Sequence, residues 1–330
     1  MLIICIVKNI KAVKKLYVGI TGATGGLGRR LTEFLSEKGF KIKCLVRESS
    51  LTCALKEISN VEIVCGDITN KKTLSEFVKD IDICFHIAAL VSSKSKEKLF
   101  FTNVEGTKNL CESLSFYNPE CRLIYCSSIV VKDYKFYKRF FVSDYTLSKY
   151  YAEKVVDSYK EKLKTTVIYP GYIFGKYDRS LINYMINMLD NGLEFFVKGG
   201  EKNAPIIHVD DLCELFYLSA VHKESIGKKY VSLEPSAEGM HFVFRRIGEQ
   251  LQYKIPEKRH SKIVARIIMS YRKIKGSKEN VLKLRGINLL SNHGKYFNNT
   301  SDTIGWIHKY NVCETVDYAL ENYLTNKGEL

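Results

Sequence analysis

The chain lacks the features that would place it across a membrane, around a structural metal ion or in a repeat array. No apolar run reaches the roughly 18 residues that a membrane-spanning helix needs. The sequence has 10 cysteines but no C-x-x-C pair and no Cys/His cluster at metal-ligand spacing, so no metal site is expected. There are only 5 prolines, and no Pro-rich linker, internal repeat or low-complexity tract is present.

The cysteines and the first residues of the chain allow a prediction of the cellular compartment. Cys44, Cys65, Cys84 and Cys126 lie inside apolar runs, so we expect reduced, buried thiols of a cytoplasmic protein. The apolar start MLIICIV has no basic n-region and no small-residue cleavage site, so no signal peptide is predicted. Residues 1–15 are instead expected to be an N-terminal extension, or the result of a start codon placed too early.

Composition excludes disorder. The 330 residues include 45% hydrophobic and 26% charged side chains, enough for one large core or two smaller ones. Lys and Arg number 51 and Asp and Glu 36, a formal net charge of +15. This balance favours anionic partners such as phosphorylated cofactors, nucleic acid or an acidic membrane surface, without choosing among them.

Apolar runs alternate with charged amphipathic segments along the first half of the chain. The runs are LYVGIT at 16–21, KIKCLV at 41–46, VEIV at 61–64, IDICFHI at 81–87, RLIYC at 122–126 and TTVI at 165–168. Every gap except the one before residue 61 can hold a crossover helix, so the pattern predicts an α/β fold with a doubly wound parallel sheet. We expect a nucleotide-binding domain over 16–170 and a smaller, interleaved substrate lobe over 171–330, with about 204–220 returning to the first domain.

The first strand runs into a glycine-rich turn, TGATGGLG at 21–28, followed by a helical segment. Gly22, Gly25 and Gly28 permit a tight turn, close approach of the backbone to a pyrophosphate, and packing of helix on strand. The N-terminus of that helix would face the anion with free N–H groups. The predicted cofactor contacts of this turn are Thr21, Gly22, Thr24, Gly25, Gly26, Leu27 and Gly28.

Arg47 follows the second expected strand, where an NAD-selective site would hold an acidic residue. A guanidinium suits a 2'-phosphate, so NADP(H) is the predicted cofactor and NAD(H) the second choice. The other interpretation is a solvated arginine at a strand end.

A Tyr-x-x-x-Lys pair places phenol and ammonium on one helix face, where the cation is expected to lower the phenol's pKa. The spacing occurs six times in this chain, so it proves nothing alone. Tyr145 and Lys149 are singled out because they open a helix soon after the strand at 122–126, which ends in Ser127 and Ser128. Carboxyl ends of parallel strands carry ligand sites, so Ser128 and Tyr145 are expected to converge.

These pieces together resemble an extended short-chain dehydrogenase/reductase, closest to the dihydroflavonol reductase and 3β-hydroxysteroid dehydrogenase group. The matching pieces are TGATGGLG at 21–28, GD at 66–67, FHIAA at 85–89, NVEGTKNL at 103–110, YCSS at 125–128, YTLSK at 145–149, PGYIFG at 170–175 and HVDDL at 208–212. They occur in family order and span about two-thirds of the chain. The resemblance implies a Rossmann fold.

The resemblance also implies a role for each matching residue. Tyr145 is the general acid/base, Lys149 holds the nicotinamide ribose, Ser128 polarises the carbonyl and Asn103 supports the proton relay. Further implied cofactor contacts are Asp67, Ile68, Ala88, Ala89, Pro170, Gly171 and Ile173, and implied substrate contacts are Val91, Ser128, Tyr172 and Tyr177. Asp67 has a second interpretation as the cap of a turn, and His86 is expected to be a packed strand residue.

Two departures from the family stand out. Tyr169 precedes Pro170, where family members often have Arg, and the short gap before Tyr145 is filled by a basic, aromatic insert at 132–141. That insert either flanks the mouth of the active site, contacts a lipid or anionic surface, or forms a solvated loop.

Carbonyl reduction, or oxidation of the alcohol, is the predicted reaction. Nucleotide-sugar epimerases typically have Asn where this chain has Tyr172, and sugar dehydratases usually have an Asp-Glu pair where Ile129 and Val130 follow Ser128. An epimerase or dehydratase with tightly bound NAD(P), and a non-catalytic NADP-binding sensor, are the alternatives. No nucleic-acid module is recognised.

The second lobe is rich in aromatic and aliphatic residues that form either a pocket for a hydrophobic ketone, such as a steroid, flavonoid or lipid-like one, or simply the core of that lobe. They are Tyr172, Phe174, Tyr177, Tyr184, Met185, Phe195 and Phe196. Residues 261–275 form an amphipathic basic helix that either packs on this lobe or contacts an anionic membrane peripherally. The resemblance also implies a homodimer through the helices that include the Tyr145 segment.

Overall fold

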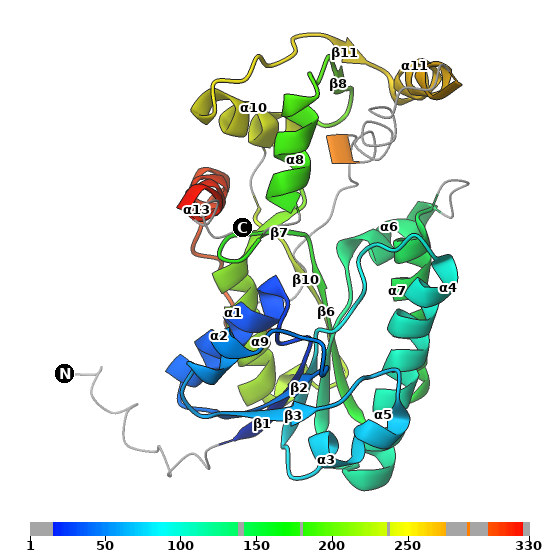
Figure 1. Cartoon of the computed structure of the whole chain (residues 1–330), viewed down its shortest axis with the longest axis vertical. Helices are drawn as coiled ribbons and strands as arrows, with labels where there is room; N and C mark the ends of the chain where they lie inside the picture. The colour runs from blue at the N-terminus through cyan, green and yellow to red at the C-terminus, as the bar shows by residue number, and fades with distance from the viewer. Residues whose placement is uncertain are drawn as a thin grey trace, which may run out of the picture.

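The structure is a computed structural model that describes residues 16–137, 142–178, 181–235, 238–274, 289–290 and 303–325. Its largest element is a seven-stranded parallel sheet with the order β10-β6-β5-β4-β1-β2-β3 (Figure 1). The strands are β1 (Tyr17–Thr21), β2 (Lys41–Val46), β3 (Val61–Cys65), β4 (Ile83–His86), β5 (Arg122–Cys126), β6 (Lys164–Pro170) and β10 (Lys229–Ser232). The strand order reverses between β1 and β4, and ligands of open α/β sheets bind beyond the carboxyl ends of the strands at such a point.

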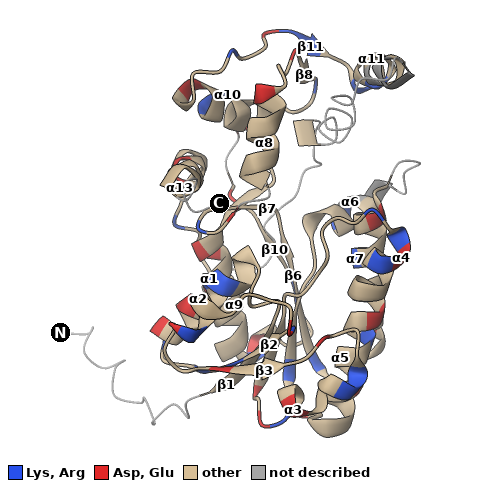
Figure 2. Ribbon diagram, in the orientation of Figure 1, with Lys and Arg blue, Asp and Glu red and all other residues tan. Residues whose placement is uncertain are grey.

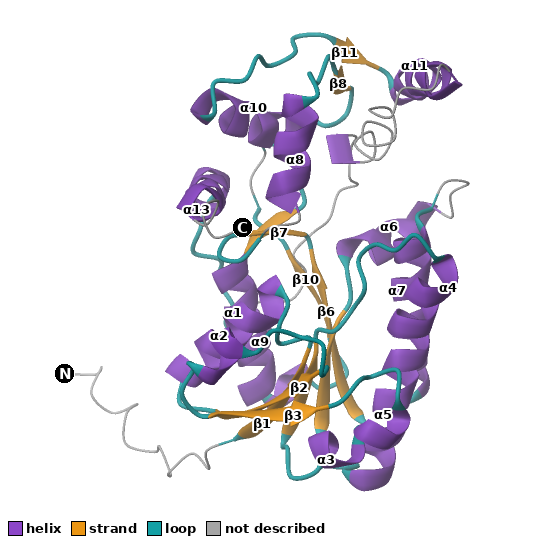
Figure 3. Cartoon of the chain, viewed as in Figure 1, coloured by secondary structure: helices purple, strands orange, loops and turns teal. Residues whose placement is uncertain are grey.

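Helices cover both faces of the sheet (Figure 3). One layer has α1 (Gly26–Glu37) and α9 (Val209–Val221), and the other has α3 (Ser75–Val78), α5 (Gly106–Tyr117), α6 (Ile129–Tyr137) and α7 (Asp144–Ser158). Successive strand residues point to opposite faces. In β5, Ile124 and Cys126 therefore join the core under α1 and α9, while Leu123 and Tyr125 join the core under α5 and α7. The short helices α2 (Cys53–Lys56) and α4 (Lys96–Phe100) lie in the connections.

The second lobe has a core of its own. Helices α8 (Leu181–Asp190), α10 (Met240–Gln250) and α13 (Val312–Thr325) bury their apolar faces together. Two small parallel sheets pair β7 (Tyr172–Phe174) with β9 (Ile206–His208) and β8 (Phe196–Val197) with β11 (Arg259–His260). Helix α11 (Lys262–Ile274) lies at the end of the molecule opposite the main sheet (Figure 1).

The predicted α/β fold with a doubly wound parallel sheet is confirmed, and each of the six expected strands is present. The returning segment at 204–220 differs in detail, because β9 pairs with β7 instead of joining the main sheet. Its helix α9 does pack in the core beneath α1. The strand that joins the main sheet after Pro170 is β10, which the sequence analysis did not predict. The domain boundaries stay a prediction.

Three smaller expectations can also be compared with the structure. Cys65, expected to be buried, is exposed, as is Cys53; both are free thiols. The insert at 132–141 is helical through residue 137 as part of α6 rather than a loop, and 138–141 lie outside the described residues. The extension at 1–15 also lies outside them. Within the described ranges, no helix has the length and apolar character that crossing a membrane requires.

Candidate active site

The turn between β1 and α1 brings main-chain atoms so close together that side chains do not fit. Gly22 has a φ of +78°, and a Cβ on it would lie 2.7 Å from the main-chain nitrogen of Ala88, just after β4. A Cβ on Gly28 would lie 2.1 Å from the carbonyl oxygen of Gly22. The Gly25 N–H donates to that same oxygen at 3.0 Å and closes the turn. The glycines therefore let α1 begin directly at the point where the strand order reverses.

The tip of this turn has the properties of an anion site. Thr24 and Gly25 are exposed, whereas Thr21 and Gly28 on either side are buried. Gly25 is the N-cap of α1 and no side chain caps the helix, whose first turn also has no acidic residue. The first N–H groups of α1 thus keep their capacity to bind an anion, supported by the helix dipole. The residues present fit the pyrophosphate of a dinucleotide.

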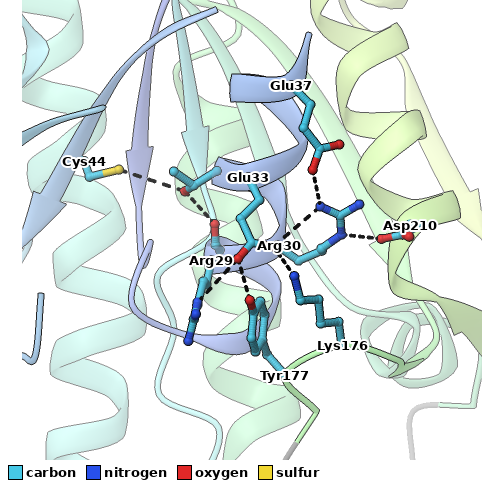
Figure 4. A network of polar contacts seen from close by, with 10 residues as sticks. Arg29, Arg30, Glu33, Glu37, Cys44, Lys176, Tyr177 and Asp210 are labelled. Carbon is cyan, nitrogen blue, oxygen red and sulfur yellow. Dashed lines mark hydrogen bonds and ion pairs between the residues drawn. The ribbon is translucent and has the colours of Figure 1, made fainter. Parts of the chain in front are cut away.

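A polar cluster holds the segment after β7 against α1 (Figure 4). Lys176 Nζ lies 2.9 Å from Glu33 Oε2, Tyr177 hydrogen-bonds the other oxygen of Glu33, and the Arg29 guanidinium lies 4.0 Å from the centre of the Tyr177 ring. A Cβ on Gly26 would lie 2.6 Å from the Tyr177 carbonyl oxygen. Gly26 therefore makes room for this segment, and Tyr177, a predicted substrate contact, lies against α1.

The same cluster ties α9 to α1. The Arg30 guanidinium pairs with Asp210 at 2.6 Å and with Glu37 at 3.1 Å. Sequence reasoning missed these contacts, because their members lie up to 180 residues apart and belong to no motif. The only local sign of these contacts in the sequence is an Arg at the start of the helix after a glycine turn.

The end of β4 is held by a buried hydrogen-bond chain. Thr21 Oγ1 lies 2.7 Å from His86 Nδ1, and His86 Nε2 lies 2.9 Å from Thr107 Oγ1. Burial, with a smaller contribution from the charge of Lys149, lowers the pKa of His86 to about 3. His86 is thus a neutral packed residue, as expected. The Ala88 N–H donates to Thr21 Oγ1 at 3.2 Å, which places Ala88 beside the glycine turn.

Tyr145, Ser128 and Lys149 come together at the carboxyl ends of β5 and β6. Tyr145 lies in the first turn of α7. The N-cap residue of this helix is Ser143, whose hydroxyl accepts a hydrogen bond from the Thr146 N–H. Tyr145 is partly exposed, and its side chain is hydrogen-bonded to Ser128. The buried Lys149 ammonium donates to the Cys126 carbonyl at 2.7 Å. Ser128 and Tyr145 therefore lie together, whereas the Ser127 hydroxyl donates to Glu153; the role of Ser128 toward the substrate stays a prediction.

The electrostatics of this group differ from the expectation that Lys149 lowers the Tyr145 pKa. Burial raises the pKa of Tyr145, the nearby Cys126 adds to the rise, and the hydrogen bond from Ser128 opposes it. Burial also lowers the pKa of Lys149 from 10.5 to about 8, against an attraction to Glu153. The phenol is therefore neutral near physiological pH and can donate a proton, while the ammonium is poised near the working pH range.

A buried carboxylate one helical turn after Lys149 connects α7 to three strands. Glu153, 1% exposed, accepts from the Ser127 hydroxyl at 2.8 Å and from the Tyr169 hydroxyl, and Lys229 Nζ lies 3.2 Å away. Lys229 also pairs with Asp157 at 2.6 Å. Sequence reasoning missed Glu153 and Lys229, although the spacing of Lys149 and Glu153 places both on one helix face.

Asn103 anchors the loop after β4. Its side chain accepts from the Leu90 N–H at 2.7 Å and donates to the Leu90 carbonyl at 2.9 Å and to Ser148 Oγ at 2.9 Å. It lies in a π-helical turn, Phe101–Glu105, of the kind often found at functional sites. Val91 follows Leu90 and is 63% exposed. A proton-relay role for Asn103 and substrate contact by Val91 stay predictions.

The remaining predicted cofactor residues lie around the same edge of the sheet. The Asp67 carboxylate accepts from the Thr69 N–H and hydroxyl, both at 2.8 Å, so it caps a turn, and Arg47 is exposed after β2. Ile68 is buried against Gly106 of α5. Of the others, Ala89 follows β4, Pro170 ends β6, Gly171 lies between β6 and β7, and Ile173 is in β7. Their contacts with a cofactor stay predictions.

Most of the second-lobe side chains considered for the substrate pocket belong to the core. Phe174, Met185, Phe195 and Phe196 are at most 5% exposed within the core of that lobe. Tyr172 and Tyr184 are partly buried and pack against it. The core interpretation therefore holds for the first four, and Tyr172 remains the candidate for substrate contact. In the part of the chain that the structure describes, no cluster of His, Cys, Asp or Glu could hold a metal ion.

The parallel sheet, the glycine turn at its reversal point and the Ser-Tyr-Lys group at the adjacent strand ends define a dinucleotide-binding α/β protein. The sequence model of the NAD dependent epimerase/dehydratase family matches residues 18–231. The chain belongs to that family.

Individual relatives agree with this assignment. The chain is 30% identical to a 3-beta-hydroxysteroid dehydrogenase of Mycolicibacterium neoaurum, over 62% of this chain and 60% of that protein. It is 26% identical to 4-hydroxy-2-methyl-3-oxo-4-farnesyl-3,4-dihydroquinoline-1-oxide ketoreductase of Stigmatella aurantiaca, over 61% and 63%. The crystal structure of gox2253 has the same fold, with a TM-score of 0.74 and 23% identity over 94% of this chain and 98% of the other. The chain thus spans about 60% of the length of these curated relatives.

Two glycine substitutions separate packing from cofactor binding. Gly28→Ala is expected to destabilise or unfold the chain, since its Cβ would lie 2.1 Å from the Gly22 oxygen. Gly25→Ala meets nothing closer than 3.4 Å and should leave thermal stability nearly unchanged. It should nevertheless weaken dinucleotide binding about tenfold or more, because the added Cβ prevents close approach of the pyrophosphate to the main chain at the tip of the turn. Thermal unfolding and dinucleotide titration check both, and unchanged affinity in folded Gly25→Ala would contradict the assigned site.

Lys149→Met is expected to lose activity yet gain stability. The pKa of Lys149 is about 8 in the folded chain against 10.5 ordinarily, so the unfolded chain binds more protons between these values. Burying the charge thus costs at most about 3 kcal/mol below pH 8, and the cost disappears as the pH rises toward 10.5. The variant should gain about 1–3 kcal/mol near neutral pH, less the lost hydrogen bond, and the gain should shrink in alkali. Denaturant unfolding at several pH values measures this.

The exposed Lys154 on the same helix provides the control, because Lys154→Met should show no such pH-dependent gain. A Lys149→Met variant whose stability follows that of wild type at every pH would contradict a buried, charged lysine.

Proposed function

We propose that this chain is an NADP(H)-dependent oxidoreductase that reduces the carbonyl of a hydrophobic small molecule, or oxidises the corresponding alcohol. The observation that carries the proposal is the hydrogen-bonded Ser128 and Tyr145 pair next to the buried Lys149, at the strand ends beside an open glycine turn. Hydroxyl groups so placed can polarise a carbonyl oxygen and protonate it.

In this mechanism the N–H groups in the first turn of α1 would hold the pyrophosphate of the cofactor. The nicotinamide supplies hydride chemistry. Ser128 donates a hydrogen bond to the substrate oxygen, and Tyr145 gives it a proton. The raised pKa of Tyr145 keeps the phenol protonated near neutral pH, so its proton is available when the substrate oxygen becomes basic. The charge of Lys149, attracted to Glu153, stabilises the phenolate that remains.

The apolar character of the substrate rests on the relatives' names and on two residues. One relative is a steroid dehydrogenase and another a ketoreductase of a farnesylated quinoline. Val91, in the loop that Asn103 anchors, and Tyr172, on β7 at the base of the second lobe, are the apolar and aromatic side chains assigned to contact it. Which ketone this chain uses is open to a substrate screen.

Epimerisation or dehydration of a nucleotide sugar is the second candidate, because the matching family includes both activities in its name. Such an enzyme retains its NAD(P) through the cycle, so purified protein would release dinucleotide on denaturation and show no net oxidation of added NADPH.

Replacing Tyr145 tests the reaction. With a panel of hydrophobic ketones, purified protein should consume NADPH, and Tyr145→Phe should lower kcat at least about 100-fold while binding NADPH with unchanged affinity. Tyr151→Phe, a partly exposed tyrosine on the same helix, is the matched control and should retain activity. Equal turnover by wild type and Tyr145→Phe would instead support a non-catalytic, cofactor-binding protein.

Replacing Arg47 tests the cofactor. Arg47 is exposed at the end of β2, where a 2'-phosphate would meet its guanidinium. Arg47→Ser should raise the KM for NADPH about tenfold or more and leave the KM for NADH nearly unchanged, since a charge-assisted pair contributes roughly 1.5–3 kcal/mol. A wild-type protein that prefers NADH would overturn this assignment.

A further inference from the structure

Helix α11 presents an apolar surface that the described chain leaves exposed. Ile263 is 72% exposed, Val264 41%, Ile267 63% and Tyr271 58%. At 100° per residue these four side chains fall within about 100° of one another around the helix. We call them the α11 apolar face. Ala265, on the far side of the helix, is fully buried, and Ile268, about 40° around the helix from Val264, packs on the core of the second lobe.

The helix therefore divides into three sectors. The sector of Ala265 and Ile268 attaches it to the protein, the α11 apolar face points outward, and Lys262 and Arg266 form a basic sector between the two. A helix that served only to cover the lobe would need the first sector alone. The exposed sector lies at the end of the molecule opposite the main sheet (Figure 1).

The charge along the α11 segment is mostly positive, although the Glu201 carboxylate lies 3.8 Å from the Arg259 guanidinium. Residues 258–278 contain eight Lys and Arg and no Asp or Glu. Figure 2 shows Lys and Arg around β11, next to the start of α11. Apolar side chains beside a dense positive charge are the combination that binds a membrane interface carrying anionic lipid.

We propose that the α11 apolar face docks this protein peripherally on an anionic lipid surface. Ile263, Ile267 and Tyr271 enter the headgroup region, and Lys258, Lys262 and Arg266 contact lipid phosphates. Charge decides between this occupant and a second copy of the chain. A symmetric dimer through α11 would bring together two copies of 258–278, a segment with eight Lys and Arg and no Asp or Glu.

Vesicle flotation of the full chain tests the proposal. The protein should float with vesicles of equal parts phosphatidylcholine and phosphatidylserine at low salt, and not with phosphatidylcholine alone. Raising the salt should weaken the binding, since it screens the lipid charge. Binding that is equal for both vesicle types, or absent from both, would overturn the proposal.

Variants identify the surface. The double variant Ile263→Glu with Ile267→Glu should lower vesicle binding about tenfold or more, whereas Phe116→Glu, at a 78% exposed position on α5, should leave it unchanged. All three positions are exposed, so thermal stability should match wild type, and NADPH binding, which does not involve α11, should persist. Vesicle binding by the double variant equal to that of wild type would overturn the assignment. So would a wild-type dimer that the double variant splits, because the second copy would then be the occupant.

Discussion

The position of the Ser128, Tyr145 and Lys149 group depends on one buried carboxylate. Glu153 lies two turns after Tyr145 and one turn after Lys149 on α7, and it is tied to Ser127 after β5, to Tyr169 in β6 and to Lys229 in β10. An unpaired buried carboxylate is costly, so these contacts are strongly coupled to folding. They hold α7 at the carboxyl ends of the strands, and the Glu153 carboxylate attracts the charge of the Lys149 ammonium. The family resemblance leads one to expect Arg at position 169. This chain has the neutral hydroxyl of Tyr169 there, and Lys229 of β10 supplies a positive charge to Glu153 instead.

The cofactor side of the site depends on sterics instead of charge. A Cβ at Gly22 or Gly28 would overlap main-chain atoms, so β1, β4 and α1 meet at their closest approach only because those side chains are absent. The two sides of the site are then joined by the sheet itself, because β5, which leads to Ser128, is the neighbour of β4. An open helix N-terminus and a neutral phenol thereby lie at the carboxyl ends of neighbouring strands, which is the arrangement that the proposed hydride and proton transfer needs.

What the sequence predicted was local, and what it missed was contact between distant segments. The six strands, the glycine turn and the pairing of Tyr145 with Ser128 follow from short-range pattern and from the rule that parallel strands end together. Lys229 and the Glu33 cluster belong to no motif, because their partners lie 76 and 143 residues away. Apolar character alone could not separate pocket from core, so Phe174 and Phe196 were as plausible in one as in the other. The rise in the Tyr145 pKa comes from burial, which the spacing of Tyr and Lys cannot reveal.

The second lobe buries most of its large apolar side chains in a core, but it also exposes the α11 apolar face. Its large side chains Phe174, Met185 and Phe196 are almost completely buried, so the lobe does not lack interior space for apolar residues. Ile263 and Ile267 remain outside although Ala265 and Ile268, on the same helix, reach that core. The helix therefore keeps an apolar face at the surface beside the partly exposed Lys262 and Arg266. An enzyme whose substrate partitions into lipid would gain access to it through this face.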